Sequence, residues 1–458
     1  MLLQQFHALL DRGWQLAFAQ GRTHERAIEH ALASLCVMGR RTISRSLGAL
    51  GRSDRDWSAD YRMFSRAGWQ PERLFDPVLD EYLQRYPKGP VVAALDDTNL
   101  RKTGKKIPGT GWQRDPLSPP FHVNLLYGLR FLQASLLFPH YREGDYPPRA
   151  IPVRFQEAAP LKKPGKRASE AERQHYRQLK KEKNLSQQAL AVLRGLRTSL
   201  DQRGGRARSL LMVGDGSFAN KTMFKASLDR TDLLARCRKD ARLCWPAPAG
   251  SRRKYGQQLF TPEQVRQQAE TPWQKAKVYL GGKFRMVRFK ELTGLLWKRG
   301  AGQQPLRLIV IAAVPYKLSR HSRPNYRQPA YFLTTDLTTP SKQLVQPCFD
   351  RWQIEVNHRD EKDLLGVGQA QVRSLHSVPR HPALVVASYS MLLLAALQQS
   401  GPGRTPDYLA QPKWRQHNSK RPSLLDLVSL LRSQCNEACV SHFIPHDFTK
   451  NLVIYADT

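Results

Sequence analysis

Two short apolar segments, each followed by aspartate, constrain the fold of this chain more than any other feature. Residues 91–95 read Val-Val-Ala-Ala-Leu and run into Asp96-Asp97-Thr98, and residues 209–213 read Ser-Leu-Leu-Met-Val and run into Gly214-Asp215-Gly216. A continuous apolar run of this length is typical of a strand that is covered on both faces, as in an α/β sheet. Ligands of open α/β sheets bind at the carboxyl ends of the strands. The sequence therefore predicts an α/β fold with acidic groups where a site would form.

The charge balance indicates what such a site would act on. The 458 residues include 73 Lys and Arg against 38 Asp and Glu, which gives a formal net charge of +35. Nucleic acid is the partner that a strongly basic surface favours, and an anionic membrane surface is the alternative. Residues 383–397 form the longest nearly apolar stretch. Because this stretch is too short to span a bilayer, we expect a buried core helix and no membrane partner.

Local patterns divide the chain into five parts. Residues 1–88 read as helical, with helices predicted over 26–38 and 42–50. The Gly39 break between them and the arginines that follow it are typical of a helix-turn-helix, and a purely structural bundle is the alternative. The predicted parts are a helical DNA-binding domain over 1–88, two core parts over 89–235 and 336–400, a β-rich insertion over 236–335 and a helical tail over 401–458.

Two further helices carry charge that bears on function. Residues 169–200 are predicted to form one long helix whose first half is strongly basic, which indicates either a solvated face or phosphate contacts. A helix predicted over 339–365 brings four polar residues within about 60° of arc, namely Arg351, Glu355, His358 and Lys362. An exposed row of ion pairs is the alternative to a functional face. Two sets of residues are expected elsewhere on this helix, Phe349, Trp352 and Val356 toward the core, and Asp350, Asp360, Glu361 and Asp363 in solvent.

Carboxylates from two strands and one helix suit one kind of chemistry. Three such groups can hold two divalent cations, and two cations about 4 Å apart stabilise the attacking and leaving oxygens of a phosphoryl displacement. Basic side chains nearby would hold the substrate phosphates. The combination of Asp97, Asp215 and Glu355 is therefore predicted to be a metal-dependent site for cutting a phosphodiester.

The ordered pieces resemble those of a bacterial insertion-sequence transposase of the DDE type. They are Leu95-Asp96-Asp97-Thr98, residues 213–218 and Arg351-x3-Glu355-x6-Lys362. The last piece matches the Tyr-x2-Arg-x3-Glu-x6-Lys signature of that family at three of four positions, because Cys348 stands where the family has tyrosine. The resemblance implies a mixed ribonuclease-H-like sheet with flanking helices, interrupted by the β-rich insertion and preceded by the helical N-terminal domain.

The resemblance also implies roles for particular residues. Asp97 would bridge two Mg²⁺ ions, for which Mn²⁺ can substitute, although Asp96 competes for this role. Asp215 and Glu355 would each complete one metal site. Two cationic residues and one aromatic residue are DNA-binding candidates, namely Arg351, Lys362 and Tyr331. For Tyr331, stacking on a flipped base is weighed against an ordinary place in the core.

The function implied is DNA transposition. The enzyme would cut DNA at the ends of an element, release a 3′ hydroxyl and use it to attack target DNA. Because two ends must be joined, we expect a dimer in the DNA complex, in the bacterial cytoplasm and associated with the nucleoid. The alternatives are a domesticated relative that acts as a nuclease, or a non-catalytic DNA-binding regulator.

Overall fold

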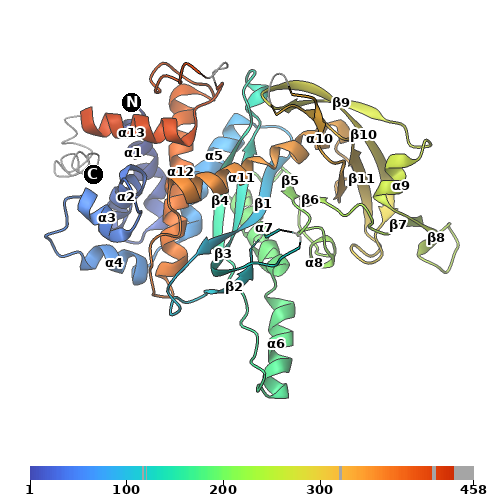
Figure 1. The fold of residues 1–458 in the computed structure, drawn as a ribbon, viewed down its shortest axis with the longest axis horizontal. Coiled ribbons are helices and arrows are strands. Elements are labelled where there is room, and N and C mark those ends of the chain that lie inside the picture. The colour runs from blue at the N-terminus through green and yellow to red at the C-terminus, as the bar shows by residue number, and fades with distance from the viewer. Residues whose placement is uncertain (116–117, 120, 319–321, 415–418, 438–458) are drawn as a thin grey trace.

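The computed structural model describes residues 1–437 except 116–117, 120, 319–321 and 415–418. One mixed sheet runs through the described part of the protein, with helices packed around it (Figure 1). Its strands follow the order β2-β3-β1-β5-β6-β14-β11-β10-β7-β8, with β4 paired to β3 and β9 paired to β10. The fold is therefore mixed α/β, as the two apolar segments predicted.

The strands at the centre of this sheet hold the predicted acidic residues. They are β1 (Val91–Arg101), β2 (Gly111–Arg114), β3 (Leu125–Phe138), β4 (Arg149–Glu157), β5 (Leu210–Gly214) and β6 (Thr231–Arg236). β1 pairs antiparallel with β3 and parallel with β5, β3 pairs antiparallel with β4, and β5 pairs parallel with β6.

β1 is longer than its apolar run. It continues to Arg101 because β3 pairs with it along that whole length, whereas its parallel neighbour β5 ends at Gly214 opposite Leu95. Asp96 and Asp97 therefore lie inside a strand and just beyond the end of the strand next to it. The prediction that an aspartate follows the end of its strand is confirmed for Asp215 after β5. It is wrong for Asp96 and Asp97, which lie within β1.

The strands of residues 236–335 extend the same sheet. They are β7 (Leu243–Pro246), β8 (Tyr255–Phe260), β9 (Gln274–Leu280), β10 (Lys283–Leu296), β11 (Pro305–Ile311) and β14 (Ala330–Thr334), and a separate small sheet contains β12 (Pro315–Tyr316) and β13 (Asn325–Tyr326). β14 joins the two regions because it pairs with both β6 and β11. The region is β-rich as predicted, and its boundaries as a domain stay a prediction.

Helices at the N-terminus pack around one long apolar helix, α12 (Ser377–Ser400). They are α1 (Leu2–Trp14), η1 (Gln15–Ala17), α2 (Gly21–Cys36), α3 (Ile43–Ala49), α4 (Ser58–Ser65), η2 (Pro71–Phe75) and α5 (Asp76–Arg85), and α13 (Leu424–Glu437) joins them (Figure 1). α12 is a core helix, since 83% of its most apolar window is buried inside the protein. The prediction that this helix is too short to span a bilayer was wrong, because the helix has 24 residues and is long enough to cross a membrane.

The helix predicted over 169–200 is two helices, α6 (Glu170–Glu182) and α7 (Leu185–Gln202). The chain breaks because the Asn184 side chain accepts a hydrogen bond from the backbone N–H of Gln187 and caps α7. α7 packs on the sheet, whereas α6 buries no residue and projects from the body (Figure 1). Two shorter helices, α8 (Lys221–Phe224) and α9 (Pro262–Gln267), and the turn η3 (His140–Arg142) complete this part.

The helix predicted over 339–365 is also interrupted. It consists of α10 (Ser341–Asp350), α11 (Gln353–Arg359) and a π-helical turn, η4 (Asp360–Leu364), in which the Leu365 N–H donates to the carbonyl of Asp360. The break after Asp350 resets the phase of the helix. Trp352 is consequently 60% exposed, and Ile354, Asn357 and His358 face inward instead. The expectation that Trp352 anchors this helix in the core was wrong.

Candidate active site

Asp96 and Asp97 lie on opposite faces of β1. Along the strand, Ala94 packs in a hydrophobic cluster with Ile354 of α11, whereas Leu95 packs in the cluster on the other face. Because side chains alternate in a strand, Asp96 shares the face of Ala94 and points toward α11. Asp97 points the other way, where its Oδ2 lies 3.3 Å from Nε of Arg130 on β3.

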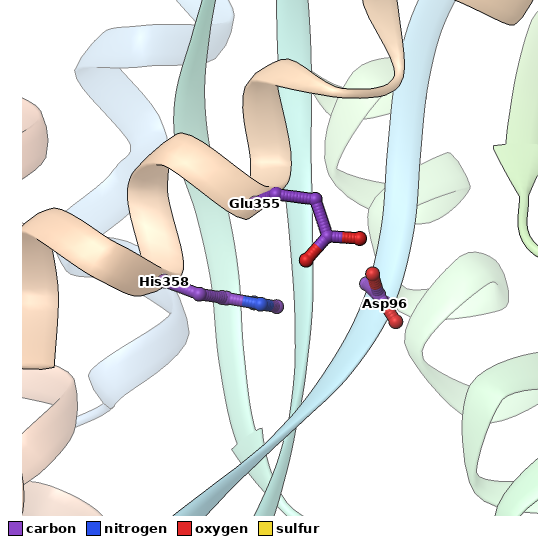
Figure 2. Close-up of side chains that lie close together, drawn as sticks. All are labelled: Asp96, Glu355 and His358. Carbon is purple, nitrogen blue, oxygen red and sulfur yellow. The ribbon is translucent and has the colours of Figure 1, made fainter. Parts of the chain in front are cut away.

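Asp96 meets two side chains of α11 (Figure 2). One ligand atom each from Asp96, Glu355 and His358 lie within 4.8 Å of one another. Glu355 and His358 are three residues apart and so occupy the same face of the helix. The structure therefore brings Asp96 together with Glu355, and Asp97 is outside this cluster.

Asp215 follows the last residue of β5, beside the point where Asp96 follows Leu95 on β1. Its Oδ1 accepts hydrogen bonds from the backbone N–H of Ser217 at 2.9 Å and from the Ser217 hydroxyl at 2.6 Å. These bonds orient the carboxylate in the loop after the strand. The charge of Asp215 is close enough to Asp96 and Asp97 to raise the pKa of both carboxyls.

Two cations on the segment from α10 to η4 approach the cluster. Nη1 of Arg351 lies 3.4 Å from Oδ2 of Asp96 and 3.5 Å from Oε1 of Glu355. Lys362 lies on the π-helical turn, where it is exposed. Desolvation lowers the pKa of Lys362, and the charges of Glu355 and Asp96 are among those that oppose this lowering. Arg351 thus touches the carboxylates, and Lys362 stands near them at the surface.

Burial and crowding of like charges hold Asp96 in an unusual state. Desolvation, followed by the charges of Asp215 and Glu355, raises the pKa of Asp96 to about 8 against the opposing effect of Arg351. Desolvation also raises the pKa of Asp97, but Arg130 counteracts it there. A divalent cation would relieve the repulsion around Asp96, which is the electrostatic situation of a metal-binding carboxylate.

His358 is a neutral side chain with an unused acceptor. Desolvation, with Lys362 and Arg351 nearby, lowers the pKa of His358 to about 3, and its side chain is only 7% exposed. Its Nε2 is buried without a hydrogen-bond partner among the described residues. Two carboxylates and an unpaired imidazole nitrogen are ligand types that bind divalent metals, so the residues present fit a metal ion.

Three of the four acids expected in solvent are buried. Asp350, Asp360 and Glu361 are 4%, 5% and 1% exposed, and only Asp363 is exposed as expected. Gln346 and the Tyr141 hydroxyl donate to Asp350 at 2.7 and 3.0 Å, and burial raises its pKa to about 7. An ideal helical wheel missed these positions, because the break and the π-helical turn rotate this part of the helix.

Two predicted positions remain, Tyr331 and Cys348, and they lie in the hydrophobic interior and at its edge. Tyr331 on β14 is 6% exposed, and its hydroxyl donates to the carboxylate of Glu263. It lines a cavity of about 640 Å³ that also touches Gly216, next to Asp215. Its burial fits the core alternative, and a role in DNA contact stays a prediction. Cys348, at the tyrosine position of the signature, is half-buried and donates to the carbonyl of Leu344.

One comparison with known proteins assigns the chain to a family. The family described as DDE superfamily endonuclease matches residues 3–301, a range that contains Asp96, Asp97 and Asp215 and stops before Glu355. No curated protein gives a significant match. The matched range covers well over half of the chain. The protein belongs to the DDE superfamily endonucleases.

Proposed function

We propose that the protein is a DNA transposase that cuts the ends of a mobile element and joins them to target DNA. Its family implies a nuclease-type enzyme with DNA as the substrate and divalent metals as the usual cofactors. The observation that carries the proposal is the meeting of Asp96 with Glu355, beside the strand end that Asp215 follows. We assign two Mg²⁺ ions to these three carboxylates.

Asp96, rather than Asp97, is proposed as the first carboxylate of the set. Asp96 shares a cluster with Glu355, whereas Asp97 is paired with Arg130 on the opposite face of β1. Each aspartate has a guanidinium nearby, Arg351 at 3.4 Å from Asp96 and Arg130 at 3.3 Å from Asp97, so the shared cluster with Glu355 is what favours Asp96. This choice replaces the assignment of Asp97 that the sequence favoured.

The strand order supports a ribonuclease-H-like core. Reading β4-β3-β1-β5-β6, three antiparallel strands are followed by two strands parallel to β1. Asp96 is on the middle strand, and Asp215 follows its parallel neighbour. In this proposal residues 1–88 form a helical DNA-binding domain, residues 236–335 form the insertion, and residues 401–458 form the tail.

The residues of the chain have distinct tasks in the proposed reaction. When bound, the two ions supply charge for the attacking and leaving oxygens. Arg351 and Lys362 hold phosphates of the cut strand, the former with a planar fork and the latter with a point charge. Water adds to phosphorus while the 3′ oxygen leaves and takes a proton. That 3′ hydroxyl then attacks a phosphorus of the target DNA in line, the target's own 3′ oxygen leaves, and the proton lost by the attacking hydroxyl passes to it. Two ends require two copies of the chain.

The cluster of Asp96, Glu355 and His358 costs folding free energy, and this cost favours an enzyme over a non-catalytic DNA-binding regulator. A regulator needs basic surface, but it has no use for two repelling carboxylates next to a buried histidine that lacks a partner. Buried polar groups without hydrogen bonds destabilise a fold. A protein that keeps such groups at one strand end therefore uses them.

The test is to incubate the purified full chain with Mg²⁺ and the DNA that flanks its own coding region. We expect cleavage at the element ends, and we expect Asp215→Asn to abolish cleavage while leaving end binding intact, because the amide keeps the shape and loses the charge. Asp232→Asn on the adjacent strand β6 is the matched control, since this aspartate accepts a hydrogen bond from the Thr335 hydroxyl near the opposite, amino-terminal end of the parallel strands. Wild-type cleavage by Asp215→Asn would overturn the proposal.

A further inference from the structure

We propose that His358 is a nitrogen ligand of the metal centre and that it makes the site prefer Mn²⁺ to Mg²⁺. The inference rests on the proposed function, because it concerns the ion held by Asp96 and Glu355. It adds a ligand that the three-carboxylate description leaves out, and it predicts which class of cation the site selects.

The position of His358 carries the first part of the argument. Its ring extends from α11 toward the space that Glu355 and Asp96 also face (Figure 2). A ring nitrogen and one oxygen of each carboxylate lie within 4.8 Å of one another. Glu355 and His358 are presented by successive turns of one helix, and Asp96 comes from the rigid central strand. Three atoms held in this way can contact one cation with small side-chain adjustments.

The missing hydrogen bond carries the second part. Ring nitrogens of three other buried histidines lie within hydrogen-bond distance of a partner: His24 with the carbonyl of Leu10, His30 with Asp60, and His140 with Tyr86 and Glu143. Nε2 of His358 has none among the described residues although its side chain is 7% exposed. Leaving a buried nitrogen unpaired destabilises the fold, and a bound cation would remove that cost.

The ligand set determines the expected preference. Mg²⁺ takes oxygen ligands and keeps several waters, whereas an imidazole nitrogen suits transition-metal ions. Replacing one oxygen position by His358 therefore favours Mn²⁺ relative to Mg²⁺. An all-carboxylate site would show less discrimination.

The experiment measures the nitrogen directly. Metal-free full-length protein is titrated with Mn²⁺, with and without a duplex from its flanking DNA, and bound Mn²⁺ is examined by electron spin-echo envelope modulation. We expect an imidazole ¹⁴N coupling in the wild type. His358→Gln should remove that coupling and weaken Mn²⁺ binding by at least about tenfold, with a smaller change for Mg²⁺. His376→Gln, at an exposed histidine that begins α12, should change neither.

The outcomes separate this inference from the proposed function. Mn²⁺ that binds in an Asp96-dependent manner but shows no ¹⁴N coupling would overturn the role of His358 and leave the carboxylate site standing. Coupling that persists in His358→Gln would equally overturn it, because the nitrogen would belong to another residue. Absence of Mn²⁺ binding to the wild type would overturn both. If His358→Gln fails to fold, the wild-type spectrum compared with that of Asp96→Asn decides the question.

Discussion

The two faces of β1 present the same chemical group in different surroundings. On one face Asp96 meets Glu355 and His358 of α11, and on the other Asp97 meets Arg130 of β3. Burial raises the pKa of both carboxyls. Asp215 adds to this rise and an arginine opposes it at both positions, whereas the charge of Glu355 adds to it at Asp96. Burial alone therefore does not separate the two aspartates, and the shared cluster with Glu355 is the reason that we propose Asp96 as the metal ligand.

The largest effect should separate the two aspartates. Asp96→Asn removes a charge from the cluster, and we expect metal affinity to fall and cleavage to drop about a thousandfold, since each 1.4 kcal/mol lost at the transition state costs tenfold. Asp97→Asn should change cleavage by less than about tenfold. Metal titration and single-turnover cleavage of end DNA measure both. If Asp97→Asn lowered cleavage more than Asp96→Asn does, the choice of Asp96 over Asp97 as the metal ligand would be wrong.

An intermediate effect should separate the two arginines. Arg351 lies within 3.5 Å of both Asp96 and Glu355, and we expect Arg351→Ala to weaken end affinity and cleavage by roughly tenfold through lost phosphate contacts. Arg351→Lys should recover only part of this, because lysine lacks the planar fork. Arg130→Ala, the matched change on the Asp97 face, should affect cleavage less. Wild-type end affinity in Arg351→Ala would argue that Arg351 only pairs with its carboxylates.

The smallest effect concerns a buried acid on the α11 side that is outside the cluster. The pKa of Asp350 is about 7 in the folded protein and about 3.9 in an unfolded chain. Its protonated form therefore favours the folded state, and this contribution is full below about pH 4 and is lost as pH rises through 7. We expect the denaturant midpoint of the wild type to fall between about pH 5 and 8 more than that of Asp350→Asn.

The difference in denaturant midpoint between the wild type and Asp350→Asn isolates the titration of Asp350 from that of other groups. Burial also raises the pKa of Glu361 to about 8 and of Glu157 to about 7, and both titrate equally in wild type and variant. Parallel pH profiles would show that Asp350 is already ionised in the folded protein. Its hydrogen bonds from Gln346 and Tyr141 would then be charge-assisted.

Local patterns were enough to predict much of the fold. The apolar runs at 91–95 and 209–213 are strands, and the region 236–335, predicted to be β-rich, contains the strands β9, β10, β11 and β14. A capping box formed by Ser169 and Glu172 starts α6, where the sequence predicts the start of a helix. These features depend on neighbours in the sequence, through side-chain period and hydrogen bonds between residues three or four apart.

The sequence by itself determined which residues could form the site, namely the acids that follow two apolar segments and the Arg-Glu-Lys spacing of one helical segment. Only the tertiary structure decided which of them meet. The pairing of β3 with β1 past Leu95 keeps Asp96 in the strand, so that the alternation of side chains turns Asp96 toward α11 and Asp97 away. The break after Asp350 rotates α11, so that His358 faces Asp96 and Trp352 faces solvent. Both outcomes depend on register and helix phase, which are set by partners distant in the chain and leave no mark in a local pattern.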